Sequence, residues 1–223
     1  MAAAFRRTLG VLILLTAFGA GTARADGLDA FNAATLAINH TLAGHVVVPA
    51  LDAYRKLPPF MQAMGANAYA NLTEPVTALS WAMAGEGAKA GESMVRFGIN
   101  STAGLLGVMD VASAAGFTVP KKYFSEGVCA AGIPAGRYVE VPGAGASSAG
   151  VLSAALAVMV GSTWALSYVS VEVAVASVVL DLVATAAALE GLVASGDVGP
   201  VRRQADYMAW LERSGCEVAA TAG

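Results

Sequence analysis

Charged and amide side chains are concentrated in one stretch of an otherwise apolar chain. Glu74 stands next to Pro75, and Arg96, Asn100 and Asp110 follow. Such groups can form a buried network of charge-assisted hydrogen bonds, or they can contact the charged headgroup of a ligand. Because buried polar groups require hydrogen-bond partners, we expect them either to hold the fold together or to line a polar passage. The structural alternative for Glu74 is a carboxylate in the first turn of a helix, near the positive end of its dipole.

The other reactive side chains form no pattern typical of a metal site or a catalytic centre. His40 and His45 stand five apart, so they point about 140° apart on a helix and cannot grip one ion together. Residues 146–150 come close to a Gly-x-Ser-x-Gly nucleophile elbow, but alanine replaces the first glycine and the alternating α/β pattern is missing. Cys129 and Cys216 either pair in an oxidising compartment or remain two buried thiols. We therefore expect no enzymatic activity, no metal and no other cofactor.

Amphipathic helices must position these side chains. Over residues 31–48 the larger apolar residues recur near the helical period, while another side carries Asn32, Thr35 and Asn39. This pattern predicts a helix that ends near Pro49.

Proline and glycine residues divide the next part of the chain. After the break at Pro58 and Pro59, the sequence predicts one helix over residues 60–71 and another over residues 73–83. The second would have Thr73 as its N-cap and Pro75 in its first turn. Six glycines and three prolines in residues 116–145 predict a loop region with one short extended piece at Tyr138–Val141.

The second half of the chain is apolar and almost uncharged. If residues 163–185 are helical, one side of the helix carries a polar stripe suited to a wet interior, which includes Thr163, Ser167, Ser170 and Asp181. Alternating valines in the same segment leave a β-strand as the alternative. Residues 151–171 could instead span a membrane.

Composition and the N-terminus indicate an exported protein. Hydrophobic residues make up 57% of the chain and charged residues 13%. Residues 1–25 have the pattern of a signal peptide, with Arg6 and Arg7 before an uncharged core and Ala23-Arg24-Ala25 as the cleavage site. A retained anchor fits poorly, because the uncharged run is shorter than the ~20 residues of a spanning helix. Without those three arginines the 13 basic residues fall to 10 against 16 acidic ones, a net charge of −6 that excludes a nucleic-acid footprint.

The chain resembles the MlaA/VacJ family. The resemblance is carried by residues 71–77 (Asn-Leu-Thr-Glu-Pro-Val-Thr), by residues 96–102 (Arg-Phe-Gly-Ile-Asn-Ser-Thr), and by Asp110. It covers residues 26–148 well and residues 149–223 weakly, which predicts a single domain over residues 26–223. Family members are commonly lipoproteins anchored through a first mature cysteine, whereas the first cysteine here is Cys129. Membrane attachment would then depend on the protein's own apolar surface or on a protein partner.

Together with the predicted helices, the resemblance implies an all-α fold. Its amphipathic helices would form a ring or bundle lying in the membrane interface, with a Gly/Pro-rich loop region. The implied location is the periplasmic face of the outer membrane, in its inner leaflet. The implied function is intermembrane phospholipid transport, in which misplaced phospholipid is removed from the outer leaflet through a polar channel between the helices. A trimeric porin and a soluble periplasmic lipid carrier are the implied partners.

The alternative function is a non-conducting outer-membrane scaffold or porin-associated envelope protein.

In a fold of the family that it resembles, Phe31 would pack the first helix down and Asn32 would bond the backbone, which could set how open the channel is. The alternative is a plain core phenylalanine beside a capping asparagine. The candidate channel or gating residues are Phe31, Asn32, Asn39, Glu74, Pro75, Arg96, Asn100, Asp110, Thr163, Ser167, Ser170 and Asp181.

Overall fold

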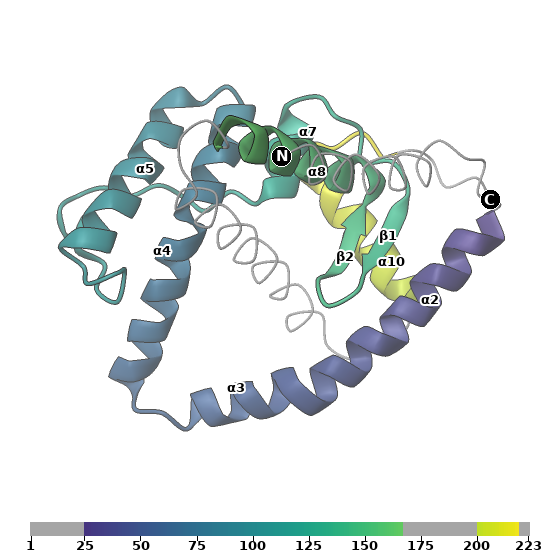
Figure 1. The fold of residues 1–223 in the computed structure, drawn as a ribbon, viewed down its shortest axis with the longest axis horizontal. Coiled ribbons are helices and arrows are strands. Elements are labelled where there is room, and N and C mark those ends of the chain that lie inside the picture. Colours follow the sequence, from purple (N-terminus) through teal and green to yellow (C-terminus); the bar gives the residue numbers. More distant parts are fainter. Residues whose placement is uncertain (1–24, 167–199, 219–223) are drawn as a thin grey trace.

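The computed structural model describes residues 25–166 and 200–218 of this protein, and these are mostly helical (Figure 1). The prediction of an all-α fold is confirmed. The predicted extended piece is also confirmed as β1 (Tyr138–Val141), which pairs antiparallel with β2 (Gly145–Ser148) so that Tyr138 faces Ser148 and Val141 faces Gly145. The predicted signal peptide lies outside the described residues, except for its last residue, and remains a prediction.

The first helix continues past the predicted end at Pro49. Helix α2 (Ala25–Leu42) passes through a π-helical turn, η1 (Ala43–Val47), into α3 (Val48–Arg55). The Val48 N–H donates to the Ala43 carbonyl, five residues back, and Pro49 sits in the first turn of α3, where its missing N–H does not interrupt the helix. Among the described residues, Gly27–Arg55 is the helix long and apolar enough to cross a membrane, and most of it is exposed.

The two helices predicted over residues 60–83 are one helix, α4 (Pro59–Met83), with Pro75 inside it. The prediction that Thr73 caps a new helix is therefore wrong. Pro75 has no N–H to offer the Asn71 carbonyl, but the helix continues on both sides of this position because packing against neighbouring elements outweighs the lost bond. Alongside α4 runs α5 (Gly87–Thr102), followed by the short α6 (Val111–Ala114) and α7 (Phe124–Ala130).

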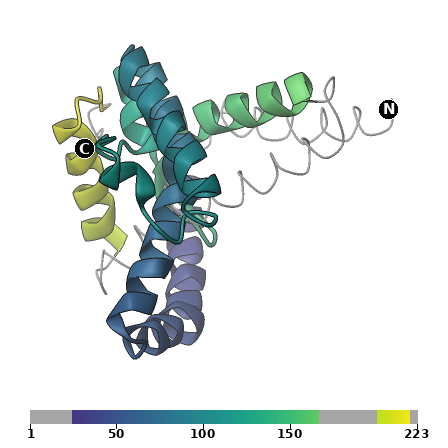
Figure 2. The same ribbon diagram turned by 90° about the vertical axis from the view of Figure 1, so that its left-hand side faces the viewer.

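The described elements contact one another in a closed cycle (Figure 1). Helix α2 contacts β1, and β2 contacts both α8 (Ala149–Leu166) and α10 (Pro200–Arg213). Both α8 and α10 contact α7, which packs on α4, and α4 returns to α3 through a short turn. The side view shows α8 projecting away from this ring (Figure 2). The long apolar helix is thus one side of a helical ring.

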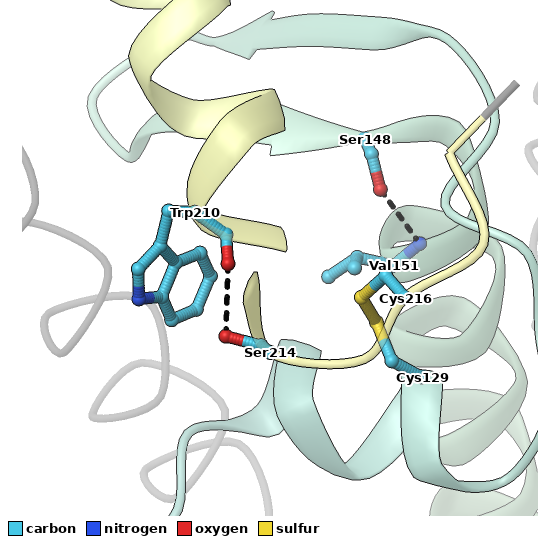
Figure 3. The surroundings of a disulfide bond; sticks show 6 residues. All are labelled: Cys129, Ser148, Val151, Trp210, Ser214 and Cys216. Carbon is cyan, nitrogen blue, oxygen red and sulfur yellow. Dashed lines mark hydrogen bonds between the residues drawn. A yellow bond between two sulfur atoms is a disulfide. The ribbon is translucent and has the colours of Figure 1, made fainter. Parts of the chain in front are cut away.

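A disulfide bond closes the ring near the hairpin (Figure 3). It joins Cys129, near the end of α7, to Cys216, just after α10, and so decides between the two alternatives that the sequence left open. The Ala135 N–H also donates to the Glu217 carbonyl at 3.0 Å. A small core of Tyr138, Met208 and Leu211 surrounds the disulfide. The end of α10 is therefore held to α7 by a covalent bond and to the hairpin by apolar contacts.

Candidate functional site

The polar strip of α2 lies against the hairpin. Asn32, Thr35 and Asn39 share one side of the helix, as predicted, and all three are buried. The Asn32 side chain acts as a neighbouring strand would: its Nδ2 donates to the Tyr138 carbonyl at 3.2 Å, and its Oδ1 accepts from the Glu140 N–H at 2.8 Å. One amide thus satisfies both a donor and an acceptor on the edge of β1.

Asn39 repeats this arrangement two turns further along. Its Nδ2 donates to Glu140 Oε1 at 2.7 Å and to the Val141 carbonyl at 3.0 Å, and its Oδ1 accepts from the Gly143 N–H at 2.7 Å. The other carboxylate oxygen of the buried Glu140 accepts from the Tyr138 hydroxyl. Both the oxygen and the nitrogen of the Asn39 side-chain amide are therefore hydrogen-bonded to protein groups.

These contacts correct the prediction that Asn32 and Asn39 line an open passage. The two amides fasten α2 to the hairpin, because burying them without such partners would be costly. Glu140 is central to this junction and was not among the predicted site residues. Its only sequence signal was a single acidic residue within a short apolar strand.

Phe31 lies on the outward side of α2, next to the amide strip. It is 39% exposed, so the alternative of a plain core phenylalanine is wrong, and its role in packing the first helix stays a prediction. The same exposed face continues along η1 and α3 to the start of α4, through Ile38, Leu42, Val46, Val48, Leu57, Phe60, Met61 and Met64. A continuous helical segment therefore turns its amides inward and its large apolar side chains outward.

The predicted polar cluster around Arg96 is present between α4, α5 and α6. Arg96 Nε donates to Glu74 Oε1 at 2.7 Å, and both residues are buried. The guanidinium also bonds Ser113 Oγ at 2.9 Å and the Phe117 carbonyl, and it lies 3.5 Å from the Asp110 carboxylate. One arginine thus links α4 to the whole loop that follows α5.

Asn100 and Asp110 complete this network. Asn100 Nδ2 donates to Asp110 Oδ1 at 3.0 Å, and its Oδ1 accepts from the Ala112 N–H at 2.9 Å. Asp110 caps α6 by accepting from the Ser113 N–H at 3.1 Å. Burial opposes ionisation of Asp110, but its hydrogen bonds to Ser113 and Asn100, together with Arg96, lower its pKa to about 2. Asp110 is therefore a carboxylate at any physiological pH.

Glu74 lies in the interior of α4, so the predicted role at a helix start is wrong. Its burial raises its pKa, and the hydrogen bond and charge of Arg96 oppose that rise. Pro75 follows directly inside the same helix. Glu74 belongs to the contact between α4 and α5, through its bond to Arg96.

The polar stripe of the second half falls mostly outside the described residues. Thr163 lies in α8, and Ser167, Ser170 and Asp181 are not described. Within the described ranges, no three His, Cys, Asp or Glu residues stand close enough to hold a metal ion. Tyr207 of α10 packs on the core around the disulfide, and its burial raises its pKa to about 12, although Ser147 and Ser148 oppose that rise.

These features define a class of protein: a mostly helical ring whose buried Asn32, Asn39 and Arg96 side chains are bonded within the protein and whose long helix exposes an apolar face of the kind that contacts membranes. The chain belongs to the MlaA lipoprotein family, whose sequence profile matches residues 24–196. This confirms the resemblance identified from the sequence.

The fold is similar to that of a solved structure described as "Structural basis for maintenance of bacterial outer membrane lipid asymmetry". The match has a TM-score of 0.52 and 24% sequence identity, and it covers 86% of this chain and 98% of that one. No curated protein matches the chain.

Proposed function

We propose that this protein helps to maintain the lipid asymmetry of the outer membrane, as a component of intermembrane phospholipid transport that removes misplaced phospholipid from the outer leaflet. Membership of the MlaA lipoprotein family supports this, and so does the described subject of the similar structure. One observation carries the proposal: along α2, η1 and α3 the polar strip is buried, whereas the large apolar side chains are exposed. The proposal involves no covalent chemistry.

The proposed location is the inner leaflet of the outer membrane, at its periplasmic face. The outward apolar face of α2 and α3 suits the acyl region, and a shallow apolar depression lined by Ala37, Ile38, Thr41 and Leu42 suits an acyl chain. The disulfide supports export, because such bonds persist in oxidising compartments. Since both cysteines are used in it, attachment would depend on this apolar face or on a protein partner, for which the family resemblance suggests a trimeric porin.

In the proposed mechanism the ring gives a phospholipid headgroup a route past hydrocarbon, which lowers an otherwise large barrier. Its acyl chains remain in or near the lipid, and a soluble periplasmic carrier receives the lipid. Asn32 and Asn39 fix the α2–hairpin junction, and the Arg96 network fixes the α4–α5 corner. These residues would act by holding the ring in shape, and the stripe from Thr163 to Asp181 would supply the headgroup wall.

A second candidate is a non-conducting scaffold. One observation favours it: Asn32, Asn39, Glu74, Arg96 and Asn100 are all engaged with other protein groups. A scaffold would bind its partner through the same apolar faces and would move no lipid.

Deleting the gene and measuring phospholipid at the cell surface tests the proposal. Cells without the protein should accumulate surface phospholipid, and the wild-type gene should reverse this. Asn32→Ala, which breaks the α2–hairpin junction, should complement poorly, whereas the matched change Phe31→Ala removes an exposed side chain and should leave the junction intact. Unchanged surface phospholipid in the deletion strain would refute a transport role and favour the scaffold.

A further inference from the structure

Two consecutive leucines are held in an unfavourable backbone conformation at the surface. Leu105 and Leu106 lie in the turn between α5 and α6, with φ values of +53° and +59°. Residues with a Cβ rarely adopt this left-handed region, and leucine has no side-chain polar group to stabilise it. They are also 64% and 77% exposed. Strain of this kind persists only where surrounding contacts impose it, and it often marks a functional element.

Backbone hydrogen bonds impose this conformation. Each N–H from Gly104 to Met109 donates to a carbonyl within residues 99–105, including Leu106 to Ser101 and Gly107 to Asn100. Irregular turns usually leave such donors to water. This turn is therefore closed on itself while its two leucines point away from the protein.

Helix α4 supports the turn from beneath. Asn67 Nδ2 donates to the Val108 carbonyl at 3.2 Å, and the Gly107 backbone packs so closely on Asn71 that a Cβ there would lie 2.4 Å from the Asn71 Cβ. At 100° per residue, Asn67 and Asn71 share a side of α4 with the exposed Phe60 and Met64, within about 60° of arc. The turn that carries the two leucines thus lies on the same side of α4 as the exposed apolar side chains at its start.

We propose that Leu105 and Leu106 form a rigid insertion element that enters the hydrocarbon of the membrane leaflet; this inference rests on the proposed function. Hydrocarbon favours backbone that is hydrogen-bonded within the protein, and every N–H of this turn from Gly104 to Met109 is bonded in that way. A protein partner would bring its own acceptors and would not need such closure. The 13 residues between Arg96 and Asp110 carry no charge, which also suits hydrocarbon.

The variant Leu106→Gly separates insertion from stability. Glycine tolerates the positive φ, so the thermal unfolding midpoint should stay unchanged or rise. Removing a leucine side chain from hydrocarbon should weaken partitioning into vesicles of phosphatidylethanolamine and phosphatidylglycerol about tenfold or more. Equal partitioning of the variant and the wild-type full chain would overturn the proposal.

Depth measurement gives an independent test. Leu106→Cys, Leu42→Cys and Ala88→Cys place a fluorophore on the turn, on the outward face of α2 and at the opposite end of α5, respectively, in a chain whose native cysteines are paired. Bromines on the vesicle acyl chains should quench the probes at positions 106 and 42 but not at position 88. Quenching of the probe at position 42 but not of the probe at position 106 would overturn the insertion element and would still support the membrane location. Quenching at neither site would overturn both.

Discussion

Replacing Arg96 with methionine should strongly destabilise the protein, because it removes one half of a buried ion pair. Arg96 is 9% exposed and Glu74 is 8% exposed, and Arg96 Nε lies 2.7 Å from Glu74 Oε1. Leaving a buried charge without its partner costs about 3–5 kcal/mol. The free energy of unfolding should fall by about this amount in Arg96→Met, as measured by urea denaturation of the full chain in mild detergent.

A surface pair supplies the matched control. Arg55 and Asp52 lie 3.3 Å apart with side chains 69% and 55% exposed, so Arg55→Met should cost at most about 1 kcal/mol. The double variant Glu74→Met, Arg96→Met removes both buried charges and should be more stable than Arg96→Met alone. The reasoning is refuted if Arg96→Met costs no more than Arg55→Met.

The pH dependence of Arg96→Met provides a second signature. Burial raises the pKa of Glu74, and Arg96 opposes that rise, so its removal should raise the pKa further. A carboxyl whose folded pKa exceeds its unfolded value binds protons more tightly in the folded state, so folding gains stability as the pH falls. The difference in the free energy of unfolding between wild type and Arg96→Met should therefore shrink as the pH falls from about 7 to about 5. Asp110, with its pKa of about 2, stays ionised over this window.

Three further predictions concern other contacts of the ring. Asn39→Ala leaves the buried Glu140 carboxylate and the Gly143 N–H without their partner, and should lower the free energy of unfolding by about 2–4 kcal/mol in the same denaturation assay. Reducing the disulfide should cost about 2–5 kcal/mol, which calorimetry with and without reductant would reveal as a lower melting temperature, and an unchanged temperature would contradict this. Gly107→Ala should destabilise far more than Gly116→Ala, because both have positive φ but only the first Cβ meets another residue; equal melting temperatures would argue against the packing of the turn on α4.

Much of the helical framework could be predicted because it depends on local patterns. The period of the apolar residues revealed α2, and the requirement that buried polar groups be bonded predicted the Arg96 cluster. The errors in the predicted helix boundaries came from proline. Pro49 and Pro75 predict helix boundaries, but a π-helical turn and tertiary packing keep both helices continuous.

The partner of the α2 strip could not be predicted from the sequence. Asn32 and Glu140 are 108 positions apart, and nothing in either local pattern states that they meet. The sequence predicts the strip itself, but a strip that binds a hairpin has the same sequence pattern as one that faces water. The strained turn at Leu105 and Leu106 was also invisible, because leucine gives no signal for positive φ.

Lipid movement through the reconstituted protein tests the central claim most directly. Vesicles containing the full chain would receive a fluorescent short-chain phospholipid in their outer leaflet, and albumin would later extract what remains accessible there. Albumin is preferable to a reducing quencher because the disulfide stays intact. If the ring passes headgroups, the extractable fraction should fall faster than in protein-free vesicles; identical rates with correctly folded protein would contradict the account.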